Sequence, residues 1–306
     1  MRRAAPLSKH VERFVSERPE EANPGLLFFR FVPSDLERER GRKFLEEVIK
    51  AANSEQTRKF LELWMERLRS LPEKLEEGGY RSKLVEGIAK ERIFIGLGGA
   101  HPLESSFSLH PLYGFPYLPS SSIKGLVGEE EICGTQKGKG EVIFFDAFPK
   151  PNRELLQYDI ISVHYKSYYD SRGRKPPAGL EGPTIINLLC IPRGTSFLFL
   201  LASKDEEKLK KGIELLQERL ELLGIGARTK LGFGRIELRV EEAEKAEILR
   251  EKISRDPGKL KVLKDAIEEP KLFWFVVYSE FRNDPEFLGL LREAGFERIK
   301  GIVECL

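Results

Sequence analysis

The sequence predicts an α+β protein, because a helical N-terminal region precedes a mixture of short strands and helices. Residues 1–80 read as mainly helical, and we expect Pro72 to end the last of these helices. That helix carries an apolar seam with three-four-three spacing at Leu61, Trp64, Leu68 and Leu71. Runs rich in branched and aromatic residues then predict strands at 91–99, 141–148, 183–190 and 195–202.

The remaining elements complete the expected core. A helix should start in "SSIKGLVGEEE", after the extended segment "PYLP". The sequence "IPRG" predicts a hairpin between the last two strands above. A second helix follows, with Ser203 and Glu206 as a capping box and Gly224 just past its end, and "RIELRV" then alternates like a strand. This β-α-β-β-α-β order predicts a modified ferredoxin-like, or RNA-recognition-type, fold.

The domain boundaries follow from this order. We expect a helical region at 1–85 packed on a core at 86–240, with an insertion at about 129–182. Residues 241–306 should extend the same domain with a charged helix at about 241–255 and the apolar segment "KLFWFVVY". Neither terminal region carries a motif that indicates a function.

The composition limits the classes of function. Charged residues make up 33% of the 306 residues, yet the net charge is only +2, so a nucleic-acid surface must be a local patch. Three isolated cysteines offer no disulfide framework, which predicts a reducing, cytoplasmic compartment. No apolar run approaches about 18 residues, so we expect no signal peptide or membrane span. The abundance of Lys, Arg and Glu hints at a thermophile.

The segment "GIGARTKLGFGR", 224–235, combines four glycines with three cations and no acid. It is not a dinucleotide fingerprint, because it joins a helix to a strand and has Thr229 at the third glycine position. The chain also has no Walker loop. The loop is either an ordinary connection or an anion-binding loop in which Gly226, Gly232 and Gly234 allow a close backbone approach beside Arg228, Lys230 and Arg235.

A second candidate anion site is the start of the helix after Pro119. One serine, Ser121 or Ser122, should cap this helix, with Ser120 beside them. Lys124 follows early, where the positive end of the helix dipole would favour an acid. The segment is either a simple cap with a lysine facing solvent or a dock for an external anion.

A third candidate lies in "DIISVHYKSYYDSRGRKPPAG", 159–179. Its aromatic residues His164, Tyr165 and Tyr168 offer stacking faces. Its cations are Lys166, Arg172, Arg174 and Lys175. Such interleaving suits single-stranded nucleic acid, although the tyrosines could instead pack on their own domain.

Histidines offer only weak alternatives. His101, His110 and Cys133 are too scattered for a typical zinc site, since zinc ligands usually come in close pairs. An acid–base enzyme could use His164 near Asp159 or Asp170, but this spacing is unspecific. We therefore expect no catalytic residue, metal or cofactor.

Taken in order, these blocks resemble a known family. "RIFIGLGGAHPLESSFSLHPLYGFPYLPSSSIKGLV", "FFDAFP", "DIISVHYKSYY" and "GIGARTKLGFGR" are similar to the repeat-associated mysterious proteins (RAMPs) of CRISPR systems. The blocks "HPLYGFPYLPSSSIKG" and "HYKSYY" resemble in particular the family of sixth subunits of the type III-B Cmr effector complex. The resemblance covers about residues 90–240, and the glycine-rich loop alone marks only the superfamily.

The resemblance implies a fold and a function. It implies a RAMP fold in which the glycine-rich loop lies on the RNA-binding face and an inserted, thumb-like hairpin stacks on RNA. Phe233 would pack beneath that loop or stack on a base. Ser120 stands where the family usually has glycine. None of Asp146, Asp159 and Asp170 matches the aspartate with which the backbone RAMP cleaves target RNA.

The implied role is that of a non-catalytic subunit. Its partners would be the CRISPR guide RNA, towards the 3′ end, the target RNA, neighbouring backbone RAMP proteins and the small helical subunit, with no membrane. Two alternatives stay open. One is a metal-independent endoribonuclease that processes CRISPR RNA with His164 or His110 as acid or base. The other is a subunit that serves assembly alone.

Overall fold

A computed structural model of the chain describes residues 8–33, 38–103, 105–135, 138–151, 154–176 and 184–239. The chain divides into two units, Met1–Leu238 and Arg239–Leu306, and the fold described here is that of the first. The helix expected at 241–255 and the apolar segment "KLFWFVVY" lie outside the described residues, as does Pro177 of the third candidate segment. In the described part of the chain, no helix is both long enough and apolar enough to cross a membrane.

Helices dominate the N-terminal region, as predicted. They are α1 (Lys9–Glu17), η1 (Pro19–Glu21), α2 (Pro24–Arg30), α3 (Arg38–Ala52) and α4 (Glu55–Glu77). Side chains at the N-caps of three of them accept backbone N–H groups of the first turn, and these are Ser8, Asn23 and Ser54. Local capping therefore sets where α1, α2 and α4 begin.

The apolar seam of α4 belongs to the core, but Pro72 does not end the helix. Leu61 and Leu68 are buried, and Trp64 and Leu71 pack against the same cluster. The helix continues past Pro72 to Glu77, and Leu75 packs against this cluster too. Proline in a helix interior removes one hydrogen bond and crowds the preceding turn. The apolar contacts on both sides of Pro72 hold the helix together in spite of that cost.

The main sheet is antiparallel, with strand order β2–β6–β1–β7. Its strands are β1 (Arg81–Ala89), β2 (Val142–Phe144), β3 (Phe148–Pro149), β6 (Ser196–Ser203) and β7 (Ile236–Leu238). Strand β3 also pairs with β6, beyond the end of β2. Both β2 and β3 thus belong to the main sheet, although they lie within the range expected to be an insertion.

The first strand lies ten residues earlier than predicted. It is β1, whereas residues 91–99 contribute only isolated bridges, of Ile93 to Ile191 and of Phe94 to Ala227. The sequence of β1 reads as polar because small residues occupy part of its buried face. At Gly87 a Cβ would lie 2.7 Å from Leu238 and 2.9 Å from Phe199, so close packing requires glycine there.

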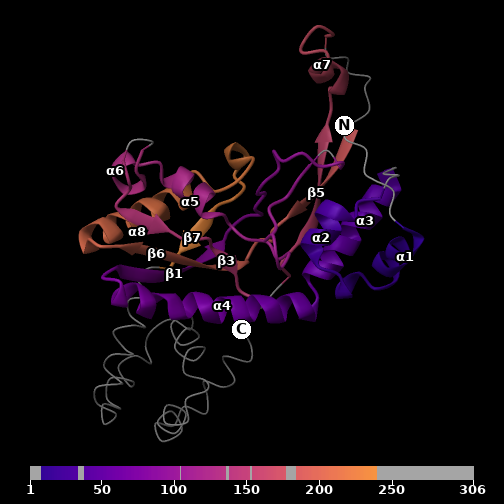
Figure 1. The fold of residues 1–306 in the computed structure, drawn as a ribbon. Helices are drawn as coiled ribbons and strands as arrows, with labels where there is room; N and C mark the ends of the chain where they lie inside the picture. Colours follow the sequence, from indigo (N-terminus) through magenta and orange to yellow (C-terminus); the bar gives the residue numbers. More distant parts are fainter. Residues whose placement is uncertain are drawn as a thin grey trace, which may run out of the picture. The chain divides into compact units, whose positions relative to one another are not determined.

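Helices cover both faces of this sheet (Figure 1). Helices α5 (Ser120–Val127) and α8 (Glu206–Leu222) pack on one face. Helix α4 packs on the other face, against Leu84, Leu198 and Leu200. Along the chain, the main sheet is thus built from β1, then α5, then β2, β3 and β6, then α8, and finally β7.

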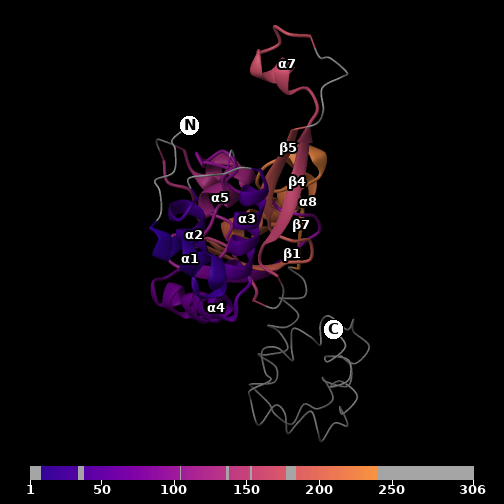
Figure 2. The ribbon, with the colours of Figure 1, turned by 90° about the vertical axis from the view of Figure 1, so that its right-hand side faces the viewer.

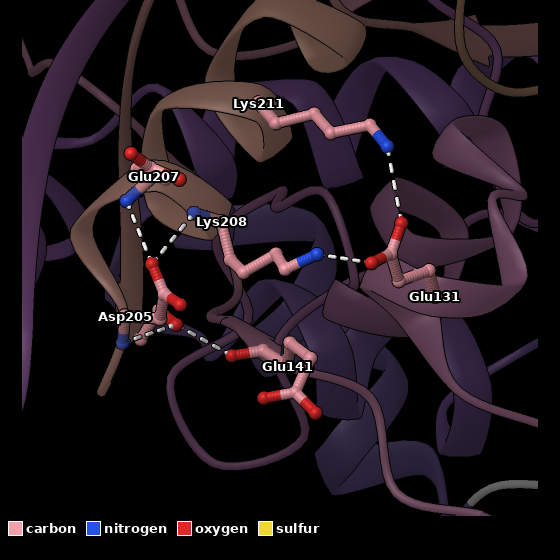
Figure 3. Close-up of polar contacts among 7 residues, drawn as sticks. Glu131, Glu141, Asp205, Glu207, Lys208 and Lys211 are labelled. Carbon is pink, nitrogen blue, oxygen red and sulfur yellow. Dashed lines mark hydrogen bonds and ion pairs between the residues drawn. The ribbon is translucent and has the colours of Figure 1, made fainter.

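Helix α8 begins differently from the prediction (Figure 3). Its N-cap is Asp205, whose carboxylate accepts the N–H groups of Glu207 at 2.8 Å and Lys208 at 3.2 Å. The predicted cap, Ser203, is the last residue of β6, and its hydroxyl donates to the Glu141 carbonyl at 2.7 Å. Ser203 is therefore part of the sheet, and Asp205, two residues later, serves as the N-cap of α8.

A surface ion-pair cluster joins α8 to the short helix α6 (Glu130–Cys133) (Figure 3). The Glu131 carboxylate contacts the Nζ atoms of both Lys208 and Lys211, the latter at 3.1 Å. These groups are exposed, so salt should screen the attraction between them. The cluster orients α6 without adding much to the core.

A two-stranded arm leaves the main body of the described residues (Figures 1 and 2). It consists of β4 (Gln157–Val163) and β5 (Thr184–Cys190), and α7 (Lys166–Asp170) lies at its far end. The predicted hairpin between 183–190 and 195–202 is wrong, because β5 pairs with β4 and β6 pairs with β1. Ile191 instead pairs with Ile93, so the chain changes sheets at "IPRG" rather than folding back.

Candidate nucleic-acid interface

The glycine-rich loop connects α8 to β7 and lies against the chain's own backbone. Gly224 follows the C-cap residue Leu223 with φ +75°, as predicted. The Ala227 N–H donates to the Phe94 carbonyl at 2.7 Å, and the Gly234 N–H donates to the Arg92 carbonyl at 2.9 Å. The loop is thus hydrogen-bonded to the backbone of residues 92–94.

Close approach explains two of the loop glycines. A Cβ at Gly226 would lie 2.2 Å from the Phe94 carbonyl oxygen, and one at Gly234 would lie 2.0 Å from the Ile225 carbonyl oxygen. Both positions also have positive φ. These glycines bring the loop against its own chain, and the amides of Ala227 and Gly234 are already hydrogen-bonded there.

Phe233 packs against the apolar cluster around Phe94, in keeping with one of its two predicted roles. Its ring and that of Phe94 form a T-shaped pair with a centroid distance of 5.0 Å and an interplanar angle of 89°. The Arg92 guanidinium carbon lies 5.4 Å from the Phe233 ring centroid. These two contacts favour a supporting role for Phe233, whose side chain is partly buried.

The cations of the loop point outward. Arg228, Lys230 and Arg235 are exposed, and Arg228 has the left-handed φ of 61°. The single turn η2 (Thr229–Leu231) lies between Arg228 and Gly232. The loop therefore displays three cations on a backbone that the rest of the chain holds in place.

The start of α5 differs from the predicted anion dock. Ser120, Ser121 and Ser122 are its first three helical residues, and Pro119 is the N-cap without a side-chain hydrogen bond. The Asp146 carboxylate accepts the Ser120 N–H at 2.6 Å. The positive end of this helix dipole thus already faces an acid of the same chain.

Lys124 does not lie in the first turn. It is the fifth residue of α5, exposed, and in the helix's last turn, where a cation suits the dipole. It lines a shallow groove of about 590 Å³ with Lys139 and the edge strand β2. The predicted anion dock rested on a lysine in the first turn of this helix. Lys124 lies in the last turn, so that argument for an anion dock no longer applies.

The arm gathers the third group of predicted residues around α7. His164, Tyr165, Tyr168, Arg172, Arg174 and Lys175 are all exposed. The Tyr168 ring contacts Tyr169 edge-on at 5.4 Å. Gly173 follows Arg172, and both have positive φ. Cations and aromatic faces thus lie together at the end of the arm, as the interleaved sequence predicted.

The base of the arm packs on the glycine-rich loop, so two of the three candidate segments meet. Phe94 forms an apolar cluster with Leu188 and Cys190 of β5, and Ile161 and Phe233 pack against it. The Arg92 Nη1 and Asp159 Oδ2 atoms lie 2.8 Å apart. Sequence reasoning noticed Asp159 as an acid but missed Arg92, since nothing local marks an arginine that bridges distant segments.

Burial raises the pKa of two cysteine thiols, Cys190 and Cys133. The pKa of the Cys190 thiol is raised to about 12, chiefly by burial and further by the nearby Asp159 charge. Burial also raises the pKa of Cys133, whose Sγ donates to the Lys124 carbonyl. Both cysteines are therefore inert thiols in this fold.

Two of the histidines in the metal and acid–base alternatives, His101 and His110, serve structural roles. His101 stacks on Phe28 at 4.0 Å, and its Nε2 donates to the Phe28 carbonyl at 2.7 Å. His110 is 9% exposed among aromatic rings, and its Nδ1 accepts the Tyr113 N–H at 3.3 Å. Burial lowers the pKa of both histidines. Among the described residues, no three His, Cys, Asp or Glu side chains gather as a metal site would require.

Comparison with known proteins places this core in a family. The family model of the RAMP superfamily matches residues 89–237. The chain carries a RAMP-superfamily region. The matched residues include α5, the arm, α8 and the glycine-rich loop, so the RAMP resemblance read from the sequence is confirmed.

Two curated relatives are similar to this chain. The CRISPR system Cmr subunit Cmr6 of Pyrococcus furiosus is 28% identical, over 48% of this chain and 65% of the relative. The CRISPR system CMR subunit Cmr6 of Saccharolobus solfataricus is 33% identical, over 49% of this chain and 55% of the relative. Each match thus spans less than two thirds of the relative's length.

A solved structure shares the fold. A chain in the cryo-EM structure of the type III-B Cmr-beta complex bound to cognate target RNA superposes with a TM-score of 0.54. The superposition covers 75% of this chain and 86% of that chain, at 23% identity. The mixed helices and antiparallel strands of this chain therefore follow an arrangement that is also found in that solved structure.

Proposed function

We propose that the chain is a non-catalytic RNA-binding subunit of a type III-B CRISPR (Cmr) effector complex. In this role it binds the guide RNA towards its 3′ end and contacts neighbouring RAMP subunits and the small helical subunit, in defence against foreign RNA. The similarity to two Cmr6 proteins supports the assembly. The main sheet, with α5 and α8 on one face, is interpreted as a modified ferredoxin-like, RNA-recognition-type core, and the arm as its thumb.

The packing of α4 argues against RNA binding on the open face of the sheet. RNA-recognition domains usually stack bases on the sheet face opposite their two helices. Here α4 covers that face, with Leu61, Met65 and Leu68 buried against it. In this proposal an RNA strand binds instead at the loops and at the arm, which display the exposed cations described above.

The exposed groups suit a single strand. Arg228, Lys230 and Arg235 of the loop can pair with phosphates, which gives affinity without sequence preference. Tyr165 and Tyr168 at the end of the arm can stack on bases of any kind. This exposed combination at two linked elements is the structural observation that favours RNA over a protein partner.

The candidate acids and bases are largely occupied in structural contacts. His110 lies within an aromatic cluster, Asp146 binds the start of α5, and Asp159 pairs with Arg92. This occupation supports a subunit that does not cut RNA. His164 and Asp170 are exposed at the end of the arm and carry what remains of the nuclease alternative.

Binding measurements on the purified full chain test the proposal. Lys230→Ala and Arg174→Ala should each weaken binding of a single-stranded RNA, and each lost phosphate contact should reduce the salt slope by roughly 0.7. Lys74→Ala, an exposed change on α4, is the matched control and should leave affinity and slope unchanged. Unchanged binding in both test variants would place the RNA surface elsewhere.

Two further measurements separate the alternatives. Crosslinking to guide RNA in a reconstituted Cmr complex should map to the loop and the arm, whereas a subunit that serves assembly alone should give no crosslinks there. Labelled guide and target RNA should stay intact with the isolated protein. Cleavage that yields 2′,3′-cyclic phosphate and is lost in His164→Ala would establish the endoribonuclease instead.

A further inference from the structure

One arginine lies between the glycine-rich loop and the arm. The Arg92 guanidinium contacts the Phe233 ring of the loop on one side and the Asp159 carboxylate of β4 on the other. Its carbonyl also accepts the Gly234 N–H at 2.9 Å. A single residue thus binds the loop through its backbone and joins loop to arm through its side chain.

The ion pair is held tightly on the arm side. The Asp159 side chain is 14% exposed and that of Arg92 is 41% exposed, so water screens their attraction only from the Arg92 side. The other carboxylate oxygen accepts the Ile160 N–H at 2.8 Å, which orients the group. Loss of Arg92 would leave a largely buried carboxylate without its cation, which is strongly unfavourable.

The backbone next to Arg92 also contacts both the arm and the glycine-rich loop. Ile93 pairs with Ile191 just after the arm, and the next residue, Phe94, pairs with Ala227 of the loop. Phe94 also packs between Leu188 of the arm and Phe233 of the loop. Residues 92–94 therefore form a short strip to which both elements are attached.

We propose that Arg92 and Asp159 are positioning residues that fix the orientation of the arm relative to the glycine-rich loop for one RNA strand. This inference rests on the proposed function. A strand that touches both elements binds more tightly when they are already held at the right separation, because less freedom is lost on binding. Phe233 contributes to the same positioning, because its ring contacts the Arg92 guanidinium.

The direction in which Asp159→Asn changes RNA affinity distinguishes positioning from simple electrostatics. Asp159→Asn removes a negative charge near a proposed RNA surface, and electrostatics alone would then strengthen binding. If Asp159 positions the arm, the same substitution weakens binding, on the order of tenfold. Asp159→Glu, which keeps the charge, should restore part of the affinity.

A second signature separates Arg92 from a direct phosphate contact. Arg92→Gln should weaken RNA binding with an unchanged salt slope, since the cations that meet phosphates remain. A direct contact would instead reduce the slope by roughly 0.7. Lys90→Gln breaks the nearby Lys90–Glu237 ion pair, which does not involve the arm, and serves as the matched control.

A distance measurement tests the orientation without RNA. Spin labels at Asp170→Cys on the arm and Glu214→Cys on α8 report their separation, with Cys305→Ser to avoid a third label. The distance distribution should be narrow in this labelled parent and broader in the Arg92→Gln and Asp159→Asn derivatives, while Lys90→Gln leaves it narrow. Thermal unfolding of each variant shows whether it is folded.

The outcomes are separable. A parent protein that binds no RNA refutes the proposed function, and the label distances still decide whether the pair orients the arm. RNA binding with unchanged distances, or tighter binding by Asp159→Asn, overturns the positioning role and leaves the proposed function standing. If the Arg92→Gln protein does not fold, Asp159→Asn and Asp159→Glu give the same readouts.

Discussion

The Asp146 carboxylate accepts the backbone N–H of Ser120 at 2.6 Å and so caps α5 from another part of the chain. Asp146 lies between β2 and β3, 26 residues after the serine. The neighbouring Ala147 and Leu118 exchange two backbone hydrogen bonds of 2.9 Å, which hold the carboxylate at the helix start. Three serines at that start had indicated a local cap, and the cap is instead tertiary.

Removal of this cap should destabilise the fold. Asp146→Ala should lower the free energy of unfolding by about 1 kcal/mol, as the loss of an N-cap side chain usually does. Asp146→Asn keeps an acceptor and should cost less. Urea unfolding measures both, with the exposed Lys124→Ala as the control. Tighter RNA binding by Asp146→Ala would reveal that a phosphate competes for this helix start.

The glycine-rich loop should tolerate a side chain at one glycine and not at another. A Cβ at Gly234 meets the Ile225 carbonyl oxygen, whereas a Cβ at Gly232 meets nothing within 4 Å, although φ is +92° there. Gly232→Ala should therefore cost only about 1 kcal/mol, the strain of the left-handed backbone. Gly234→Ala should cost several times more, because backbone must move. Similar melting temperatures for the two variants would contradict this account.

The stability of the protein should fall as the pH drops below neutrality. Burial lowers the pKa of His101 and His110 in the folded state, and both Nδ1 atoms accept backbone N–H groups. The unfolded state therefore takes up protons first, below about pH 6.5. The stabilisation is fully present above that pH and is lost as the pH falls through the lower, folded-state pKa values. Urea unfolding at several pH values should show this slope, and a His101→Gln variant should show a shallower one.

The end of the arm should matter for RNA and not for folding. Replacement of residues 172–176 by a Gly-Ser linker should shift the melting temperature little, because these side chains are exposed. The same change should impair RNA binding. Tyr165→Ala should cost about 1–3 kcal/mol of RNA binding if the ring stacks on a base. Unfolding on loop replacement, with RNA binding kept in what folds, would show that the arm's end is structural.

Local signals in the sequence determined several features. The helical N-terminal region, the C-terminal glycine of α8 and the exposed, cation-rich end of the arm all follow from neighbours in sequence. The RAMP region was also readable, because its blocks keep their residues and their order. Periodicity, glycine at a left-handed position and clustered charge are short-range signals, and the chain shows them directly.

Tertiary structure decided the rest, because the deciding contacts join residues far apart in sequence. Strand β1 pairs where its glycine lets Leu238 and Phe199 close in, although its own sequence is polar. Strand β5 pairs with β4 rather than with β6, which follows it in sequence. Both edges of β6 are already paired, one with β1 and the other with β2 and β3. The Arg92–Asp159 pair spans the loop and the arm, and its energy depends on burial that only the assembled fold creates.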